Sequence, residues 1–427
     1  MAEQSESIPS KQQIVSGLPY FLIAKDEHDF VYSAILTLHR PVDGDSLSKA
    51  VNLASKRYPY LRMRPVKSFT GIELEQADEM IACIETPNWV PLNSDASHHY
   101  LLAVTYHDKT IRVEFFRGLC SRKGIYPFLK TVIYYYFTLL KKEEQKIENV
   151  RLTDTPMSAA EYFDPYSEDL PEHEEKDMKM PKQVKALKLL KLGLVKKSEM
   201  YVRRIWIQKN VLEKYLESVH GSEKSFLLLE VFKAVNSAHF SEKAPVVGSA
   251  CADMSRVLRA SSSIIHPSHF LSIVYDQELK EEDSVEAQHR IIRQRLKELS
   301  DYDNIYPLLA ADQAIHRRVN KLPMFALRQA VMKSWISKCN SWATFFINFE
   351  DGVDLGSCNK YIKEFYIEPY IGMAELFIDA TTFKDEYVIS WYQQWNENLY
   401  FDAFCRELEM NKIKYEIGYQ GKLTSTN

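Results

Sequence analysis

The chain has 427 residues, 45% hydrophobic and 26% charged, which is typical of a soluble globular protein with room for two domains. Its 54 basic and 58 acidic side chains give a net charge of −4, so the basic footprint of a nucleic-acid-binding protein is absent. The six cysteines are widely spaced, with no CxxC or Cys/His cluster; we expect no metal site and a reducing, cytoplasmic compartment. With no secretion signal and no apolar run of membrane-spanning length, we also expect no transmembrane segment.

The first half of the chain alternates strand and helix patterns. A buried strand is predicted over residues 31–38. A helix is predicted to begin at Asp45 and to end before Pro59, because apolar residues recur there at the spacing of a core-facing helix. Short strands are expected at residues 61–63, 72–74, 101–106 and 111–116, and a long aromatic helix after Gly124.

The second half is also mixed α and β. We predict strands near residues 201–207, 246–251, 270–275, 342–349, 373–380 and 386–391, and helices near residues 225–240, 284–299 and 401–409. Between the halves, residues 166–197 change from an acidic run to a basic Lys/Leu run, which indicates a charged linker. The basic run could form a helix on a membrane surface. We favour a crossover lying on its own protein, because the apolar stripe is short and the acidic run opposes anionic lipid.

Five segments carry a resemblance when they are taken in order. The first two are VYSAILTLHRPVDGDSLSKAVNLASKRYPYLRMRP, from Val31, and IRVEFFRGLCSRKGIYPFLKTVIYYY, from Ile111. The other three are ACADMSRVL, from Ala250, SHFLSIVY, from Ser268, and FFINFEDGVDLG, from Phe345. Together they resemble the CoA-dependent acyltransferase superfamily, in particular its bacterial alcohol acetyltransferase-like branch, and the related condensation domains. No single segment is specific, but the ordered set covers nearly the whole chain.

The resemblance implies a mixed α/β (α+β) fold of two chloramphenicol-acetyltransferase-like lobes with a tunnel or cleft between them. We therefore expect an N-terminal lobe over residues 1–165, the linker over residues 166–197 and a C-terminal lobe over residues 198–427. The resemblance also implies an acyl-CoA or acyl-carrier thioester as co-substrate or ligand, and no covalently bound cofactor. It leaves the oligomeric state open, because the family contains both monomers and oligomers.

The family's chemistry depends on an HHxxxDG motif at the end of a strand. Its second His takes a proton from the nucleophile, and its Asp holds the loop through a distant Arg. In this chain the two His, the Asp and the Gly are replaced by Phe116, Arg117, Ser121 and Arg122. A guanidinium stays protonated at every usable pH, so Arg117 cannot serve as the base. Loss of a positioned base lowers a rate by about 10²–10⁴.

Other positions match the family outside the motif. Arg256 matches the Arg implied to reach the motif Asp; facing Ser121 instead, it would need a new acceptor. His269 replaces a family Asn and is our candidate for a relocated base, although a packed or solvated histidine also fits there. Asn348 is expected in the tunnel wall. Cys120, inside the motif loop, is a weaker candidate for a nucleophile, because a lone cysteine in an apolar loop is usually inert.

Two interpretations follow. In the first, which we favour, the chain is a non-catalytic relative that binds an acyl thioester, an anionic ligand or a biosynthetic partner protein, with Arg117 and Arg122 as a cationic pair for the anion. In the second, it is an active O- or N-acyltransferase with another base, such as His269. The first predicts no His, Glu or Asp side chain near the centre of the tunnel, and the second predicts one.

Overall fold

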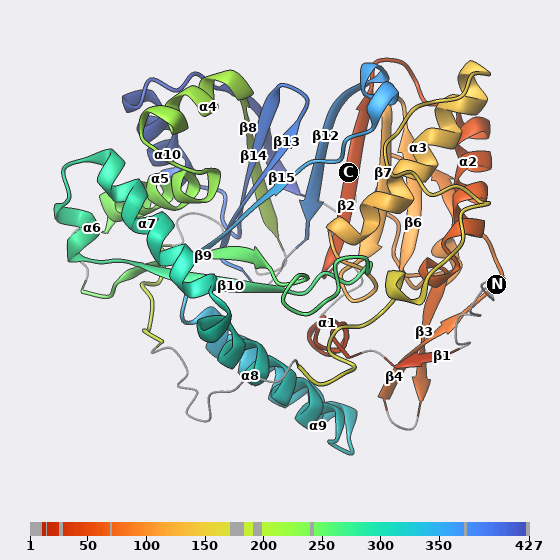
Figure 1. Cartoon of the computed structure of the whole chain (residues 1–427), viewed down its shortest axis with the longest axis horizontal. Coiled ribbons are helices and arrows are strands. Elements are labelled where there is room, and N and C mark those ends of the chain that lie inside the picture. Colours follow the sequence, from red (N-terminus) through yellow and green to blue (C-terminus); the bar gives the residue numbers. More distant parts are fainter. Residues whose placement is uncertain are drawn as a thin grey trace.

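The computed structural model describes residues 11–13, 15–24, 29–68, 71–170, 183–190, 199–239, 243–370 and 374–423. Two mixed α/β lobes lie side by side, each built on a sheet with helices packed against it (Figure 1). This arrangement confirms the predicted fold class. Each lobe has its own apolar core, with Phe115 and Phe128 buried in the first and Trp391 and Trp395 in the second.

The first lobe is built on a five-stranded sheet of order β12-β2-β7-β6-β5. Its strands are β2 (Val31–Leu38), β5 (Cys83–Glu85), β6 (Leu102–His107), β7 (Thr110–Phe116) and β12 (Ile362–Pro369). A small sheet of order β1-β4-β3 contains β1 (Lys11–Gln13), β3 (Met63–Ser68) and β4 (Gly71–Gln76). The helices are α1 (Leu18–Ile23), α2 (Gly44–Arg57) and α3 (Tyr126–Lys141). Strand β12 comes from the second half of the sequence and pairs antiparallel with β2, so the lobes are joined through a shared sheet.

Helix α2 follows the predicted apolar pattern. Its N-cap is Asp43, whose carboxylate accepts a hydrogen bond from the Ser46 backbone N–H at 2.8 Å, and this places the start one residue before the predicted Asp45. Four of its buried residues are the predicted stripe of Leu47, Ala50, Val51 and Ala54. Pro59 begins a 3₁₀ turn, Pro59–Leu61, so the strand predicted at residues 61–63 is wrong: β3 begins only at Met63.

The second lobe is built on a seven-stranded sheet of order β10-β9-β11-β13-β14-β8-β15. Its strands are β8 (Met200–Gln208), β9 (Val246–Asp253), β10 (Ser268–Tyr275), β11 (Phe345–Asp351), β13 (Leu376–Phe383), β14 (Glu386–Gln393) and β15 (Glu416–Leu423). Its helices are α4 (Lys209–Ser218), α5 (Glu223–Ala238), α6 (Gln277–Glu281), α7 (Val285–Ser300), α8 (Tyr302–Asn320), α9 (Phe325–Asn340) and α10 (Leu399–Met410). Short 3₁₀ turns also occur at Asp95–Ser97, Lys123–Ile125, Ala159–Glu161 and Gly356–Tyr361.

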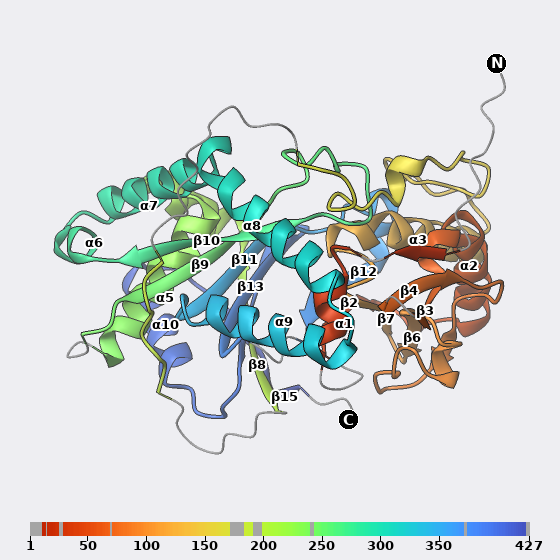
Figure 2. The ribbon, with the colours of Figure 1, turned by 90° about the horizontal axis from the view of Figure 1, so that it is seen from below.

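Helices α8 and α9 join the two lobes on the underside of the molecule. Seen from below, α9 lies beside α1 of the first lobe (Figure 2). The sequence analysis predicted neither helix, and it placed the start of the strand that is β11 at residue 342 instead of Phe345. The strand predicted at 373–380 is β13, which begins at Leu376; residue 373 lies outside the described residues.

Only part of the predicted linker belongs to the described residues. Residues 183–190 form no helix, and Leu187 and Leu189 are buried in the core of the second lobe. The backbone N–H of Leu187 donates to the carbonyl oxygen of Pro245 at 2.8 Å. These contacts support a crossover that lies on its own protein. Across the described ranges, we find no helix that combines the length and the apolar character needed to cross a membrane.

Glu114 is a buried carboxylate in the middle of β7. It accepts hydrogen bonds from the Val90 backbone N–H at 3.0 Å and from the Thr105 hydroxyl at 3.1 Å, and its side chain is inaccessible to solvent. Burial raises the pKa of Glu114 from 4.5 to about 7. The folded chain therefore holds this proton at pH values where the unfolded chain has lost it. The free energy of unfolding therefore falls as the pH rises from the pKa of Glu114 in the unfolded chain to its pKa in the folded chain.

We predict that Glu114→Gln removes part of this pH dependence. The Gln oxygen can accept from Val90 and its amide can donate to Thr105, so both hydrogen bonds survive without the charge. At pH 8 the variant should be more stable by about 1–3 kcal/mol, and at pH 5 close to the unchanged chain. Urea unfolding at the two pH values measures this. Glu148→Gln, at an exposed position, is the control; an equal gain there would contradict the prediction.

Candidate active site between the lobes

A cavity of about 560 Å³ lies between the lobes. The first lobe contributes α1 and the loop after β7, and the second contributes β9, β10, β11, α8 and α9. The wall includes the aromatic side chains Tyr20, Phe30, Tyr32, Phe270, Trp335, Trp342 and Phe346. Its volume falls in the range of small-molecule sites, about 300–1,000 Å³. The cleft implied by the two-lobed resemblance is therefore present.

The loop after β7 carries the residues that replace the catalytic motif. Phe116, the last residue of β7, is 7% exposed, and its ring centre lies 4.6 Å from that of Phe21. It takes no part in the cavity lining. The next side chain, Arg117, faces the cavity, while its backbone N–H donates to the carbonyl oxygen of Phe30 at 2.8 Å. Arg117 therefore stands on the cavity wall, one residue beyond the end of β7.

Ser121, at the position of the motif Asp, contacts a histidine that the sequence analysis did not consider. Its hydroxyl lies 3.0 Å from Nδ1 of His266 and accepts from the Gly124 backbone N–H at 2.9 Å. Burial lowers the pKa of His266, although Asp253 and a hydrogen bond with the Ser261 backbone oppose the shift. These bonds engage the imidazole in holding the loop, so His266 is a poor candidate for a free base.

Arg122 is bound across the lobe interface and does not face a ligand as a free cation. Its guanidinium pairs with Asp379 on β13, and its Nε lies 3.0 Å from Glu350 Oε2 on β11. Arg122 is 8% exposed and Asp379 is 2% exposed. This finding corrects the prediction that Arg117 and Arg122 form a cationic pair for an anion, because two carboxylates already neutralise Arg122. It also places the arginine in the motif loop and the carboxylates in the second lobe, the reverse of the implied arrangement.

Arg256 does not reach Ser121. It lies in the turn that follows β9, its side chain is exposed, and it is absent from the cavity lining. The expected rewiring of a buried Arg256 is therefore wrong, because the turn directs this residue to solvent. Asn348 does lie in the cavity wall, where its amide donates to Asp379 Oδ1 at 3.0 Å. It thus supports the carboxylate that holds Arg122.

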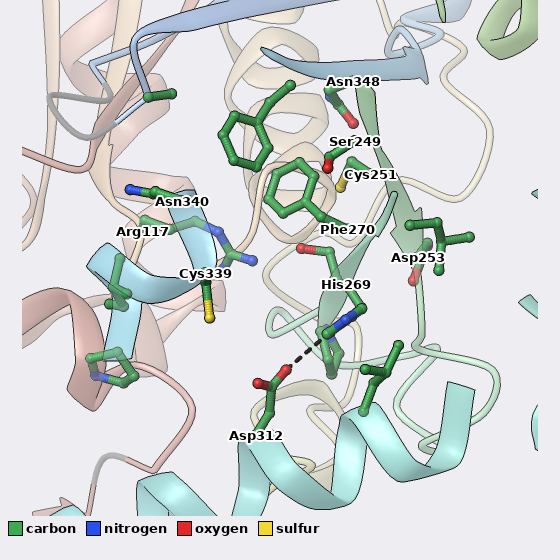
Figure 3. A pocket seen from close by; sticks show the side chains of 18 of the residues that line it. Arg117, Ser249, Cys251, Asp253, His269, Phe270, Asp312, Cys339, Asn340 and Asn348 are labelled. Carbon is green, nitrogen blue, oxygen red and sulfur yellow. Dashed lines mark hydrogen bonds and ion pairs between the residues drawn. The ribbon is translucent and has the colours of Figure 1, made fainter. Parts of the chain in front are cut away.

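His269 on β10 lines the cavity and is paired with Asp312 on α8. The His269 Nδ1 lies 3.0 Å from Asp312 Oδ2, and the two side chains are 19% and 26% exposed (Figure 3). No bond from its Nε2 to another residue in the described ranges accompanies this pair. A carboxylate on Nδ1 fixes the tautomer that carries a lone pair on Nε2, which is the form a general base needs. The pair therefore has the chemistry of a positioned proton acceptor.

Other reactive side chains in or near the cavity are less suited to catalysis. Burial raises the pKa of Cys120, and Arg117 opposes this only in part, so the thiol stays protonated and the candidate nucleophile is not supported. Burial also raises the pKa of Cys251. His316 follows Asp312 by one helical turn, and burial lowers its pKa. In the described part of the chain, no group of three or more His, Cys, Asp or Glu side chains could hold a metal ion.

The sequence analysis missed Asp312 and His266. Asp312 lies on α8, a helix that was not predicted, in the run AADQAIHRR. A helix predicted there would have placed Asp312 and His316 on one face, because they are four residues apart. His266 precedes a proline in the loop between β9 and β10, and no local pattern distinguishes it from a surface histidine. Only the packing of that loop against the Ser121 loop reveals its contact.

No family model and no curated protein sequence matches the chain. Its fold, however, matches solved structures along almost its whole length. TRI101 of F. sporotrichioides, complexed with coenzyme A and T-2, has 11% identity and a TM-score of 0.60, with 96% of this chain and 100% of that chain covered. The epimerization domain from the third module of tyrocidine synthetase B has 12% identity and a TM-score of 0.58, with 96% and 98% covered.

A third solved structure has the same two-lobed fold. The starter condensation domain of rhizomide synthetase, in mutant form with C8-CoA, has 9% identity and a TM-score of 0.58, with 94% of each chain covered. At such low identity the likeness establishes the fold alone. The resemblance drawn from the five sequence segments is confirmed at this level: the chain has the fold of the CoA-dependent acyltransferases and condensation domains.

Proposed function

We propose that this chain, a protein with the CoA-dependent acyltransferase fold, binds an acyl thioester in the cavity between its lobes and transfers the acyl group to an alcohol or amine. His269 is the general base, and Asp312 is the residue that positions it. The observation that carries the proposal is the pair formed by His269 Nδ1 and Asp312 Oδ2 on the cavity wall. The catalytic interpretation calls for an acid–base side chain near the centre of the tunnel, and the position of His269 on the cavity wall supports it.

The reaction can be written with these side chains alone. The Nε2 of His269 takes the proton from the acceptor hydroxyl or amine as the acceptor atom attacks the thioester carbonyl carbon. The carbon–sulfur bond breaks, and the thiolate leaves with the proton that the imidazolium returns. Asp312 stabilises the imidazolium while it holds the proton. Binding both substrates in one cavity supplies proximity as well.

The thioester half of the proposal is supported by solved structures of the same fold. TRI101 was crystallised with coenzyme A, and the rhizomide synthetase domain with C8-CoA. Here the apolar wall, with side chains such as Trp335 and Phe270, suits an acyl chain. The domain boundaries near residues 165 and 198 remain part of the proposal; strand β12, from the second half of the sequence, pairs with β2 of the first lobe and so crosses them.

A second candidate function is binding without catalysis. The observation that favours it is Arg117, a permanent cation at the position where the resemblance implies the base. In that case the cavity serves recognition of an acyl thioester or another anion. A biosynthetic partner protein is a further candidate for the ligand, and the cytoplasmic location remains a prediction.

Titration calorimetry with CoA and acyl-CoAs of increasing chain length, together with a thiol-release assay on a panel of alcohols and amines, tests both candidates. Acyl-CoA binding with thiol release above the uncatalysed rate is expected for the transferase. Binding without release for any acceptor would leave the non-catalytic candidate. If no acyl-CoA binds, the transferase fails, and the non-catalytic candidate keeps only another anion or a partner protein as its ligand.

A further inference from the structure

We propose that the acceptor is an amphipathic hydroxy- or amino-carboxylic acid, with its carboxylate bound by Arg117 and its hydroxyl or amine facing His269. This inference rests on the proposed function, because it names the second substrate of the same cavity. It depends on three features of the wall: the pairing of its charged side chains, the environment of Arg117, and the short stretch of chain between His266, which Arg117 contacts, and His269.

The charges that line the cavity are unevenly paired. The lining contains four cations and three carboxylates: Arg117, Arg122, Lys123 and Lys224 against Asp253, Asp312 and Glu350. Each carboxylate has a partner, in the pairs Asp253–Lys123, Glu350–Arg122 and Asp312–His269. Arg117 and Lys224 form no ion pair with any carboxylate of the described residues, and both donate to backbone carbonyl oxygens. Asp379, which is not a lining residue, also pairs with Arg122, so Arg122 and Lys123 are both matched by carboxylates. Arg117 and Lys224 are the lining cations left without a carboxylate partner among the described residues.

Arg117 lacks the counter-ion that its environment favours. Its Nη2 lies 3.4 Å from the carbonyl oxygen of His266, at the outer limit of a hydrogen bond, and its guanidinium carbon is 5.3 Å from the centre of the Tyr20 ring. Neither neighbour supplies a full negative charge. A half-buried guanidinium is stabilised most by a carboxylate that accepts two parallel N–H bonds. By comparison, Arg122 in the same loop has two carboxylates as counter-ions.

The unpaired guanidinium of Arg117 favours a ligand with a single negative charge and an apolar body. Asp253, Asp312 and Glu350 stand on the same wall and would repel a pyrophosphate, which carries several negative charges where Arg117 supplies one positive charge. A carboxylate carries one charge and matches the planar guanidinium. The rest of the ligand meets Tyr20, Phe270 and other aromatic side chains, which favour a hydrocarbon over a sugar or peptide.

The short path from His266 to His269 sets the length of the acceptor. Arg117 contacts the His266 carbonyl, and His269 follows three residues later, at the start of β10. Three residues of extended chain span at most about 10 Å. The backbone at His266 therefore lies within about 10 Å of the backbone at His269, which is the basis for proposing a short hydrocarbon between carboxylate and nucleophile. Figure 3 shows both side chains on the wall of this one cavity.

Calorimetry without any acyl donor tests the inference, using ω-hydroxyoctanoate and its methyl ester as a matched pair. The unchanged chain should bind the acid about 10–100-fold more tightly than the ester. Arg117→Gln should bind both equally, and Arg117→Lys, which keeps the charge but loses the planar fork, should keep part of the preference. Lys224→Met is the matched control at the other unpaired cation and should keep the full preference. Thermal unfolding of each variant verifies its fold.

The possible results separate the inference from the proposed function. Equal binding of acid and ester by the unchanged chain overturns the inference, as does a preference that Lys224→Met removes and Arg117→Gln leaves intact. If Arg117→Gln instead weakens free CoA by the same factor as the acid, the bound anion belongs to the thioester carrier, and the acceptor assignment fails. If the unchanged chain prefers the acid through Arg117 but releases no thiol from acyl-CoA, the carboxylate site is supported and the proposed transferase activity is ruled out.

Discussion

Replacing His269 with alanine is expected to lower the rate of thiol release by about 10²–10⁴ while acyl-CoA binding stays unchanged, because a general base acts on the proton transfer and not on the thioester. The imidazole is held by Asp312 at 3.0 Å and lines the cavity, so its loss removes the proton acceptor without removing a core side chain. Initial rates with a saturating acceptor, and calorimetry with the same acyl-CoA, measure the two quantities.

Two further histidine variants make the test specific. His98→Ala is the matched control, since His98 lies in an exposed loop, with its Nδ1 3.0 Å from the Met80 carbonyl oxygen. It should leave the rate unchanged. His266→Ala addresses the other cavity histidine, which is bonded to Ser121. If His266→Ala abolishes thiol release and His269→Ala does not, the assigned base is wrong.

Asp312 is expected to act through His269. Asp312→Asn keeps the size of the side chain but loses the charge that stabilises the imidazolium, so kcat should fall by about tenfold or more while KM for the acyl-CoA holds. A purely structural role would instead move both parameters together or lower the stability. Asp312→Glu, which restores a carboxylate on the same helix face, should recover part of kcat. Equal rates for the Asn variant and the unchanged chain would count against the pair.

The fold was more predictable than the site because it depends on patterns within single elements. Alternation and helical spacing identified β2, α2, β6 and β7, and the ordered segments identified the two-lobed architecture. The missed elements explain the missed chemistry. Helix α9 shows no clear apolar stripe: its buried residues are Arg328 and Met332 alone. Helix α8 contains Pro307, which argues against a helix in a sequence.

The site residues were predictable only where position alone decides their role. Arg117 follows the end of a strand, so its place on the cavity wall could be read from the motif alignment. His269 was identified by position, but its partner Asp312 is 43 residues away and belongs to the unpredicted α8. The ion pairs of Arg122 involve Glu350 and Asp379, two strand residues of the other lobe. No local sequence pattern indicates that these two carboxylates lie beside Arg122.

Arg122→Met is expected to destabilise the chain by about 3–5 kcal/mol, because it leaves buried carboxylates without their cation. Asp379, at 2% exposure, loses its guanidinium partner, and Glu350 retains the ion pair with Lys123, 3.5 Å away, as its one remaining salt bridge within the described ranges. Urea unfolding, followed by the signals of the buried tryptophans, measures the loss. Lys123→Met, beside it in sequence, is the matched control: its side chain is 42% exposed, so its pairs with Asp253 and Glu350 should contribute about 0–1 kcal/mol.

A second change in the same background shows what the first one measures. Arg122→Met combined with Asp379→Asn removes both charges of the pair. Most of the lost stability should then return, because the main cost of the single change is the desolvation of an unpaired carboxylate and not the absence of the salt bridge. A double variant as unstable as the single one would mean that Arg122 acts through packing. Recovery would show that the cost of Arg122→Met comes from the buried carboxylate left without its cation, and that the ion pair between the lobes depends on matched charges.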